Sequence, residues 1–173
     1  MEILLVIDML NDFIKEDGAL YCGPASQKMV PFVRDKIAQF RTKGAPVLFV
    51  ADSHEPDDKE FDMFPPHCVK GTKGAKVLAG LMEEGDRLIH KKRYSAFYGT
   101  QLEDILDSLR KGKDLTVHVV GVCTNICVLY TVEELRNRDI RTVVYREGVA
   151  SFDEAAHEFA LTQMESVLGA ELV

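Results

Sequence analysis

Short apolar runs rich in β-branched residues alternate along the chain with segments whose apolar residues recur at helical spacing. The apolar runs predict strands over residues 3–7, 46–51, 87–90, 115–122, 142–145 and 170–173. The helical pattern predicts helices over residues 24–43, 100–109, 127–138 and 152–168. Because alternating strands and helices form parallel sheets with helices on both faces, we expect an α/β fold: a three-layer α-β-α sandwich around a mainly parallel, Rossmann-like sheet of about six strands.

The predicted fold also locates a candidate site, because ligands bind to open parallel sheets outside the carboxyl ends of the strands. The residues that directly follow predicted strands are Asp8, Asp52, His54, Lys91 and the segment from Cys123 to Cys127. A long irregular stretch, residues 52–73, follows the second predicted strand and is rich in Asp, Glu, His and Pro. A loop of this length inside a compact domain usually serves a function.

Composition narrows the class of protein. The chain has 173 residues, 46% apolar and 28% charged, which suits one compact domain over residues 1–173. A net charge of −7 offers no electrostatic footprint for nucleic acid or anionic lipid, so we expect a small-molecule partner instead. No segment is long and apolar enough to span a bilayer, and the first strand does not resemble a signal peptide. These features predict a cytoplasmic protein.

Four cysteines, Cys22, Cys68, Cys123 and Cys127, stand at spacings that match no paired zinc motif. Cys127 would lie in the first turn of a predicted helix, where the helix N-terminus favours a thiolate and free N–H groups can bind an oxyanion. This setting suits a nucleophile, but from this segment alone a buried core cysteine is the favoured interpretation. A Cys123–Cys127 redox pair is disfavoured because the spacing is not Cys-x-x-Cys, and Cys22 and Cys68 are expected to be inert.

An acid and a lysine complete the candidate chemistry. Asp8 follows the first strand, where a buried carboxylate requires a partner or a role, and Asp12 is a second candidate in the same segment. Lys91 follows the third strand and would stabilise both Asp8 and a cysteine thiolate if it points into the cleft. Lys92 and Arg93 stand next to it, so an exposed basic run is the alternative.

The long loop carries a candidate metal site. Asp52 and His54 lie on the same side of an extended segment because strand side chains alternate, and His67 follows two prolines that stiffen the loop. Glu60 lies between them. Two histidines and two carboxylates suit zinc, iron or manganese with a position left open for water or substrate. Other carboxylates of the loop could replace Glu60, namely Asp57, Asp58 and Asp62, and a solvated acidic loop with incidental histidines is the alternative.

Together the motifs resemble the isochorismatase-like cysteine hydrolases and, within them, the nicotinamidases. The resemblance runs nearly end to end and rests on segments 6–13, 52–54, 64–67, 90–100 and 121–127. The order Asp, Lys, Cys marks the wider superfamily, whereas the metal cluster separates nicotinamidases from isochorismatases and ureide-type hydrolases. The chain departs from the commoner family form, which has Gln where Leu10 or its neighbour stands. The resemblance also implies a cis peptide bond before Cys123.

The resemblance implies a reaction and a role for each motif. Asp8, Lys91 and Cys127 would be the catalytic residues of an amidohydrolase that converts nicotinamide to nicotinate and ammonia, through a cysteine thioester, in NAD salvage. The backbone N–H groups of Cys123 and Cys127 would form the oxyanion hole, and the substrate pyridine nitrogen would contact the metal. The implied metal ligands are Asp52, His54, Glu60 and His67, holding one divalent ion, zinc in the first place and iron or manganese otherwise. The implied aromatic walls of the substrate pocket are Phe13, Phe64 and Tyr94, whose other role would be core packing.

Two other functions stay open. One is a different hydrolase of the superfamily that acts on a ureide-type amide or an enol ether without this metal cluster. The other is a non-catalytic metal-binding module on the same fold. The sequence leaves open which metal is bound, the range of amides accepted and whether the chain forms a homo-oligomer.

Overall fold

The computed structural model describes residues 1–173 and contains one sheet of six strands, in which every pair of neighbours is parallel. The strand order across the sheet is β3-β2-β1-β4-β5-β6. The strands are β1 (Glu2–Ile7), β2 (Val47–Asp52), β3 (Arg87–Lys91), β4 (Thr116–Val122), β5 (Arg141–Ala150) and β6 (Glu171–Leu172). The α/β sandwich with a parallel sheet predicted from the sequence is therefore confirmed.

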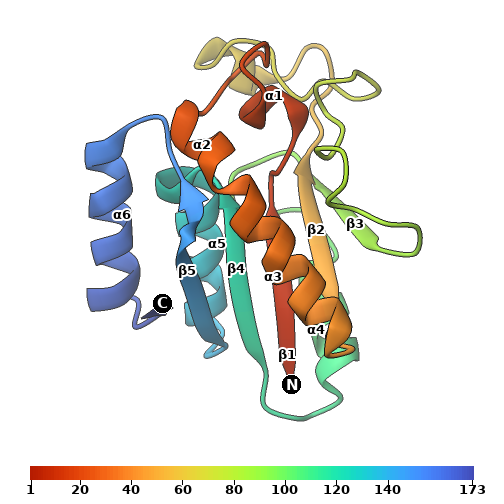
Figure 1. Cartoon of the computed structure of the whole chain (residues 1–173), viewed down its shortest axis with the longest axis vertical. Helices are drawn as coiled ribbons and strands as arrows, with labels where there is room; N and C mark the ends of the chain where they lie inside the picture. Colours follow the sequence, from red (N-terminus) through yellow and green to blue (C-terminus); the bar gives the residue numbers. More distant parts are fainter.

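Helices cover both faces of the sheet (Figure 1). One face is covered by α1 (Asn11–Ile14), α2 (Pro24–Lys28) and α3 (Val30–Thr42). The other face is covered by α4 (Leu102–Arg110), α5 (Leu129–Asn137) and α6 (Glu154–Ser166). The central strand β1 serves both layers. Ile3, Leu5 and Ile7 pack in the core with α4, α5 and α6, whereas Leu4 and Val6 pack with α1 and α3. This alternation explains why β1 is apolar throughout.

Three element boundaries differ from the sequence prediction. The helix expected over residues 24–43 is divided into α2 and α3, next to Pro31, whose ring nitrogen has no N–H to donate. The helix expected to begin at Cys127 is preceded by a π-helical turn, η2 (Thr124–Val128). Strand β5 continues past the polar residues at 146–147, because Val149 and Ala150 pair with the end of β4 after an irregularity in the register.

The carboxyl ends of β1, β2, β3 and β4 lie together at one end of the sheet, beneath α1 and the long loop between β2 and β3 (Figure 1). That loop contains a short 3-10 helix, η1 (Lys59–Asp62). The arrangement brings the residues that follow these four strands into one place. None of the helices combines the length and apolar character that a membrane crossing requires.

Candidate active site

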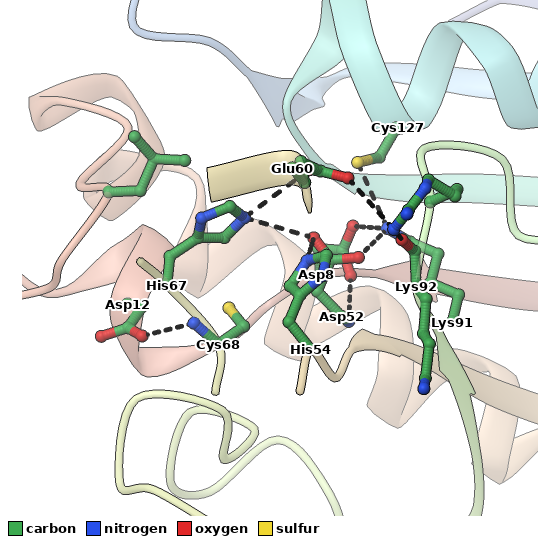
Figure 2. A network of polar contacts seen from close by, with 12 residues as sticks. Asp8, Asp12, Asp52, His54, Glu60, His67, Cys68, Lys91, Lys92 and Cys127 are labelled. Atoms are coloured by element: carbon green, nitrogen blue, oxygen red, sulfur yellow. Dashed lines mark hydrogen bonds and ion pairs between the residues drawn. The ribbon is translucent and has the colours of Figure 1, made fainter. Parts of the chain in front are cut away.

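Lys91 lies at the centre of a buried polar cluster at the carboxyl end of the sheet (Figure 2). Its Nζ atom is 2.8 Å from Oδ2 of Asp8 and 2.5 Å from Oδ1 of Asp52. The same Nζ atom lies 3.4 Å from Sγ of Cys127. Asp8 is further fixed by the backbone N–H of Asp52, which donates to its Oδ1 atom at 2.9 Å. The structure thus brings together the acid, the lysine and the cysteine selected from the sequence, and Lys91 rather than its basic neighbours points inward.

The surroundings set the charge of each group. Burial and the neighbouring Asp52 carboxylate raise the pKa of Asp8 to about 6, although Lys91 acts in the opposite direction. Burial also raises the pKa of the Cys127 thiol well above its usual range, against the effect of Lys91. Burial disfavours the charged form of Lys91, but the two carboxylates outweigh it and raise its pKa. At neutral pH the cluster therefore holds a carboxylate, an ammonium and a neutral thiol, so the thiolate expected from the helix N-terminus is not the resting form.

The turn that carries Cys127 begins at Cys123, which follows a cis peptide bond after Val122. The resemblance implied this bond. The carbonyl oxygen of Cys123 accepts the N–H groups of Ile126 at 3.0 Å and of Val128 at 3.2 Å. Because these two donors flank Cys127, the turn fixes the direction in which its buried sulfur points.

Two side-chain contacts from the C-terminal part of the chain hold this turn. Thr124 Oγ1 and His157 Nδ1 are 2.8 Å apart, and the Ser151 hydroxyl donates to Oδ1 of Asn125 at 2.6 Å. The sequence reasoning missed these contacts. They join residues that are far apart along the chain, and no motif in either segment signals the pairing.

A second group of side chains could hold a metal ion next to this cluster. The ligand atoms of Asp52, His54 and His67 all lie within 4.8 Å of one another, and all three residues are buried. His54 Nε2 is 3.7 Å from Oδ2 of Asp52, and it has no hydrogen-bond partner although it is buried. Glu60 stands beside this group, with Oε1 at 3.8 Å from Nε2 of His67. Two imidazoles and a carboxylate that converge in this way fit zinc or a similar divalent metal.

The histidines are oriented by contacts on their far side. Nδ1 of His54 lies 3.2 Å from a carboxylate oxygen of Asp58, and Nδ1 of His67 is 2.8 Å from the carbonyl oxygen of Pro65. Such contacts leave Nε2 as the free ligand atom, as is usual for metal-binding histidines. Asp58, one of the alternative ligands of the loop, thus faces Nδ1 of His54 and the guanidinium of Arg93 rather than the metal group.

Burial also affects the pKa values of these side chains. Burial lowers the pKa of His67, which keeps its imidazole neutral and able to bind a metal. In His54 burial acts in the same direction, but the close approach and negative charge of Asp52 outweigh it and raise the pKa. Burial and the charge of Asp52 raise the pKa of Glu60. The excess of negative charge around Asp52 would be relieved by a divalent cation.

Asp12 has a structural task that sets it apart from Asp8. Its carboxylate accepts the backbone N–H of Cys68 at 2.7 Å and that of Ala19 at 3.2 Å. Because Cys68 follows His67 in the chain, Asp12 ties α1 to the loop that carries His67. It takes no part in the cluster around Lys91.

A small pocket joins the two groups of side chains. It is lined by Phe13, Leu20, Asp52, Glu60, Phe64, His67, Tyr94, Cys123, Ile126, Cys127 and Phe152. The sequence-predicted aromatic residues are therefore among its walls. Its free volume is only about 30 Å³, room for one water molecule, so side chains of the wall must move to admit an aromatic amide. A much larger cavity, about 830 Å³, lies elsewhere, along β3 and the long loop, and none of the clustered polar groups lines it.

Fold and site together define a class of protein. The chain belongs to the isochorismatase family, whose model, described as the Isochorismatase domain, matches residues 2–172. Among similar solved structures is the nicotinamidase/pyrazinamidase PncA from Bacillus subtilis, with a TM-score of 0.92 and 34% identity over 99% of this chain and 98% of that one. The pyrazinamidase of Pyrococcus horikoshii, solved in complex with zinc, is 31% identical, with a TM-score of 0.90 over 99% and 98% of the two chains.

The relatives also differ in substrate. The N-carbamoylsarcosine amidase of Thermoplasma acidophilum is 36% identical to this chain, with a TM-score of 0.86 over 99% of this chain and 94% of that one. The family and its hydrolase chemistry on amides are thus shared with proteins that act on different molecules. The family resemblance read from the sequence is confirmed, whereas the substrate has to be argued from the site.

Proposed function

We propose that this chain is a metal-dependent nicotinamidase, which hydrolyses nicotinamide to nicotinate and ammonia. One observation carries the proposal: the Cys127 thiol and the Asp52, His54 and His67 donor group line or adjoin the same small pocket. A carboxamide placed at the sulfur would have its ring within reach of a metal held by these donors. The names of the similar structures from Bacillus subtilis and Pyrococcus horikoshii support the same substrate class.

In the proposed reaction Asp8 is the general base. Its ionised carboxylate takes the proton of the neutral Cys127 thiol, and the thiolate attacks the carboxamide carbon. Lys91 contacts both groups, so its charge stabilises the negative charge before and after the proton moves. The backbone N–H groups of Cys123 and Cys127 hold the developing oxyanion.

The second half of the reaction reverses the proton transfers. Protonated Asp8 gives its proton to the departing nitrogen, so ammonia leaves and the acyl group stays on the Cys127 sulfur as a thioester. Asp8 then takes a proton from the attacking water, the carbon–sulfur bond breaks, and the proton returns to the sulfur. A divalent metal bound by Asp52, His54 and His67, with Glu60 beside them, would act as a Lewis acid toward the ring nitrogen or water.

The aromatic residues of the pocket would hold the ring. The ring centroids of Phe13 and Phe64 lie 5.5 Å and 6.2 Å from that of His67, so both surround a proposed metal ligand. Tyr94 borders the same pocket and stacks on Tyr130 at 5.8 Å between centroids. Apolar walls around a few polar groups are typical of sites for small aromatic ligands.

An ammonia-release assay tests the proposal. We expect release from nicotinamide by the purified protein, little release from benzamide, which lacks the ring nitrogen, and none by the Cys127→Ala variant. Treatment with chelator should lower the rate, and addition of zinc, iron or manganese in turn should restore it and identify the metal. Metal analysis of the wild type and of His67→Ala supplies a readout that does not depend on activity.

Each competing function has its own outcome in this assay. A protein that hydrolyses N-carbamoyl amides but not nicotinamide, with or without metal, would point to the other hydrolase branch instead. Metal bound at stoichiometric amounts without hydrolysis of any amide would indicate a binding module. Either result would overturn the nicotinamidase proposal.

A further inference from the structure

Two buried thiols touch behind the candidate nucleophile. Sγ of Cys22 lies 3.0 Å from Sγ of Cys123, and both side chains are free thiols in the structure. Cys22 precedes α2, and Cys123 is the first residue of the turn that carries Cys127. No motif predicts a contact between these two cysteines, which stand 101 residues apart. Cys22, expected to be inert, thus has a sulfur partner at the edge of the site.

The pair stands between two cavities. Cys123 borders the small pocket that contains Cys127. Cys22 borders a second cavity of about 680 Å³, whose walls also include His157. Phe152 borders both cavities. The larger cavity therefore offers a small solute a route to the Cys22 side of the pair that does not pass through the pocket of Cys127, although the Cys22 side chain itself is buried.

We propose that Cys22 and Cys123 form a redox-modification site, in which a peroxide converts the two thiols into a reversible disulfide. The sulfur of Cys22 attacks one peroxide oxygen, so the O–O bond breaks, one water leaves and Cys22 becomes a sulfenic acid. The sulfur of Cys123 then attacks the sulfur of Cys22, the S–S bond forms, and the sulfenic oxygen leaves as a second water. Two thiols are oxidised by two electrons and one peroxide is reduced to two waters. A dithiol reductant reverses the change.

The assignment of roles to the two sulfurs follows from their positions. Cys22 belongs to the wall of the larger cavity, although its side chain is buried, so we assign it the first encounter with an oxidant that enters there. The contact with Cys22 and burial both raise the pKa of the Cys123 thiol, which disfavours its thiolate form in the reduced protein. Cys123 therefore resolves the sulfenic acid rather than forming it.

Bond formation would move the nucleophile turn. The two sulfurs must approach from 3.0 Å to about 2.05 Å. Cys123 holds the turn through its carbonyl oxygen, which binds the N–H groups on either side of Cys127. A misplacement of about 1 Å in a catalytic constellation can lower the rate by about 100-fold. This functional consequence rests on the proposed function, whereas the disulfide itself does not.

Peroxide treatment followed by peptide mapping tests the site. Reduced protein is treated with hydrogen peroxide, quenched with catalase, alkylated and digested without reductant. We expect one linked peptide pair, joining Cys22 to Cys123, in the wild type. The same pair should appear in Cys68→Ser, a matched control that removes another buried thiol, and be absent from Cys22→Ser. A map with no linked pair, or with a link to Cys127, would overturn the proposal.

The effect on activity is measured in parallel. We expect peroxide to lower wild-type amidase activity by about 100-fold, with recovery on addition of dithiothreitol. Cys22→Ser should match the reduced wild type before treatment and lose the dithiothreitol-reversible part of the inhibition. Equal reversible inhibition of both proteins would refute the coupling between disulfide and turn. If the reduced protein hydrolyses no amide, the alkylation rate of Cys127 replaces activity as the readout. A failure of the proposed function can then be told apart from a failure of the redox proposal.

Discussion

Replacement of Asp8 by asparagine should abolish catalysis and stabilise the fold. The pKa of Asp8 rises from 3.8 to about 6 in the folded chain. Because a carboxyl with a raised pKa binds its proton more tightly when folded, its contribution to stability is complete below about pH 4 and is lost as the pH rises through about 6. This change of pKa corresponds to about 3 kcal/mol at neutral pH. The uncharged amide of Asp8→Asn avoids that loss.

Part of this gain will be offset at Lys91. The amide nitrogen of Asp8→Asn would face Nζ of Lys91, which lies 2.8 Å from Oδ2 of Asp8 in the wild type. Lys91 keeps Asp52 as a partner, so its charge stays compensated. We therefore expect a net gain of about 1 to 3 kcal/mol in the free energy of unfolding near neutral pH.

Urea denaturation of both proteins checks this expectation. The two are compared with chelator present, because a bound cation would itself shift the pKa of Asp8. The gain should be largest above about pH 7 and fall to roughly half at about pH 5. The exposed Asp17→Asn change serves as a matched control and should alter stability by less than about 0.5 kcal/mol. A less stable Asp8→Asn protein, or a difference that does not depend on pH, would refute the reasoning.

Three further outcomes are expected. Lys91→Met should lower the free energy of unfolding by about 3 to 5 kcal/mol, because two buried carboxylates lose their cation. In a double-mutant cycle measured in urea, adding Asp8→Asn should recover part of that loss, and additive effects of the two substitutions would contradict this expectation. Gly121→Ala should lower the free energy of unfolding, measured in urea, by at least about 3 kcal/mol. A Cβ at this position would lie 2.0 Å from the carbonyl oxygen of Ile7, at a φ of +133°. The control Gly44→Ala, also at positive φ but in open space, should lower it by only about 1 to 2 kcal/mol. In a steady-state pH profile, kcat/KM should fall tenfold per pH unit on the acid side as the base Asp8 becomes protonated. The bound metal should place this fall below the pKa of about 6 that Asp8 has without a cation, and a profile without any acid limb would exclude Asp8 as that base.

The fold could be predicted because its rules act locally. Apolar runs and helical spacing identified all six strands, and the carboxyl-end rule placed Asp8, Asp52, Lys91 and Cys127 at one site. Boundaries failed where tertiary contacts outweigh local pattern. Strand β5 continues past polar residues because β4 supplies a pairing partner, which no local pattern reveals. The π-helical form of η2 was equally invisible in the sequence.

The candidate site was less predictable in its details. Histidines and carboxylates in the loop indicated a metal group, but only the structure shows that Asp58 faces Nδ1 of His54 rather than the cluster. The neutral resting state of Cys127 likewise depends on its burial, which an argument from the helix N-terminus does not include. The contact between Cys22 and Cys123 depends on the chain path around the sheet. In each case the missing information is a distance between residues remote in sequence.

The position of Lys91 between Asp8 and Cys127 also determines how charge is distributed during the proposed reaction. When the proton passes from the thiol to the carboxylate, the negative charge moves from an oxygen to a sulfur beside the same ammonium. The number of ions inside the protein does not change. The first chemical step thus rearranges charge within a buried cluster, and no additional ion has to be created away from solvent.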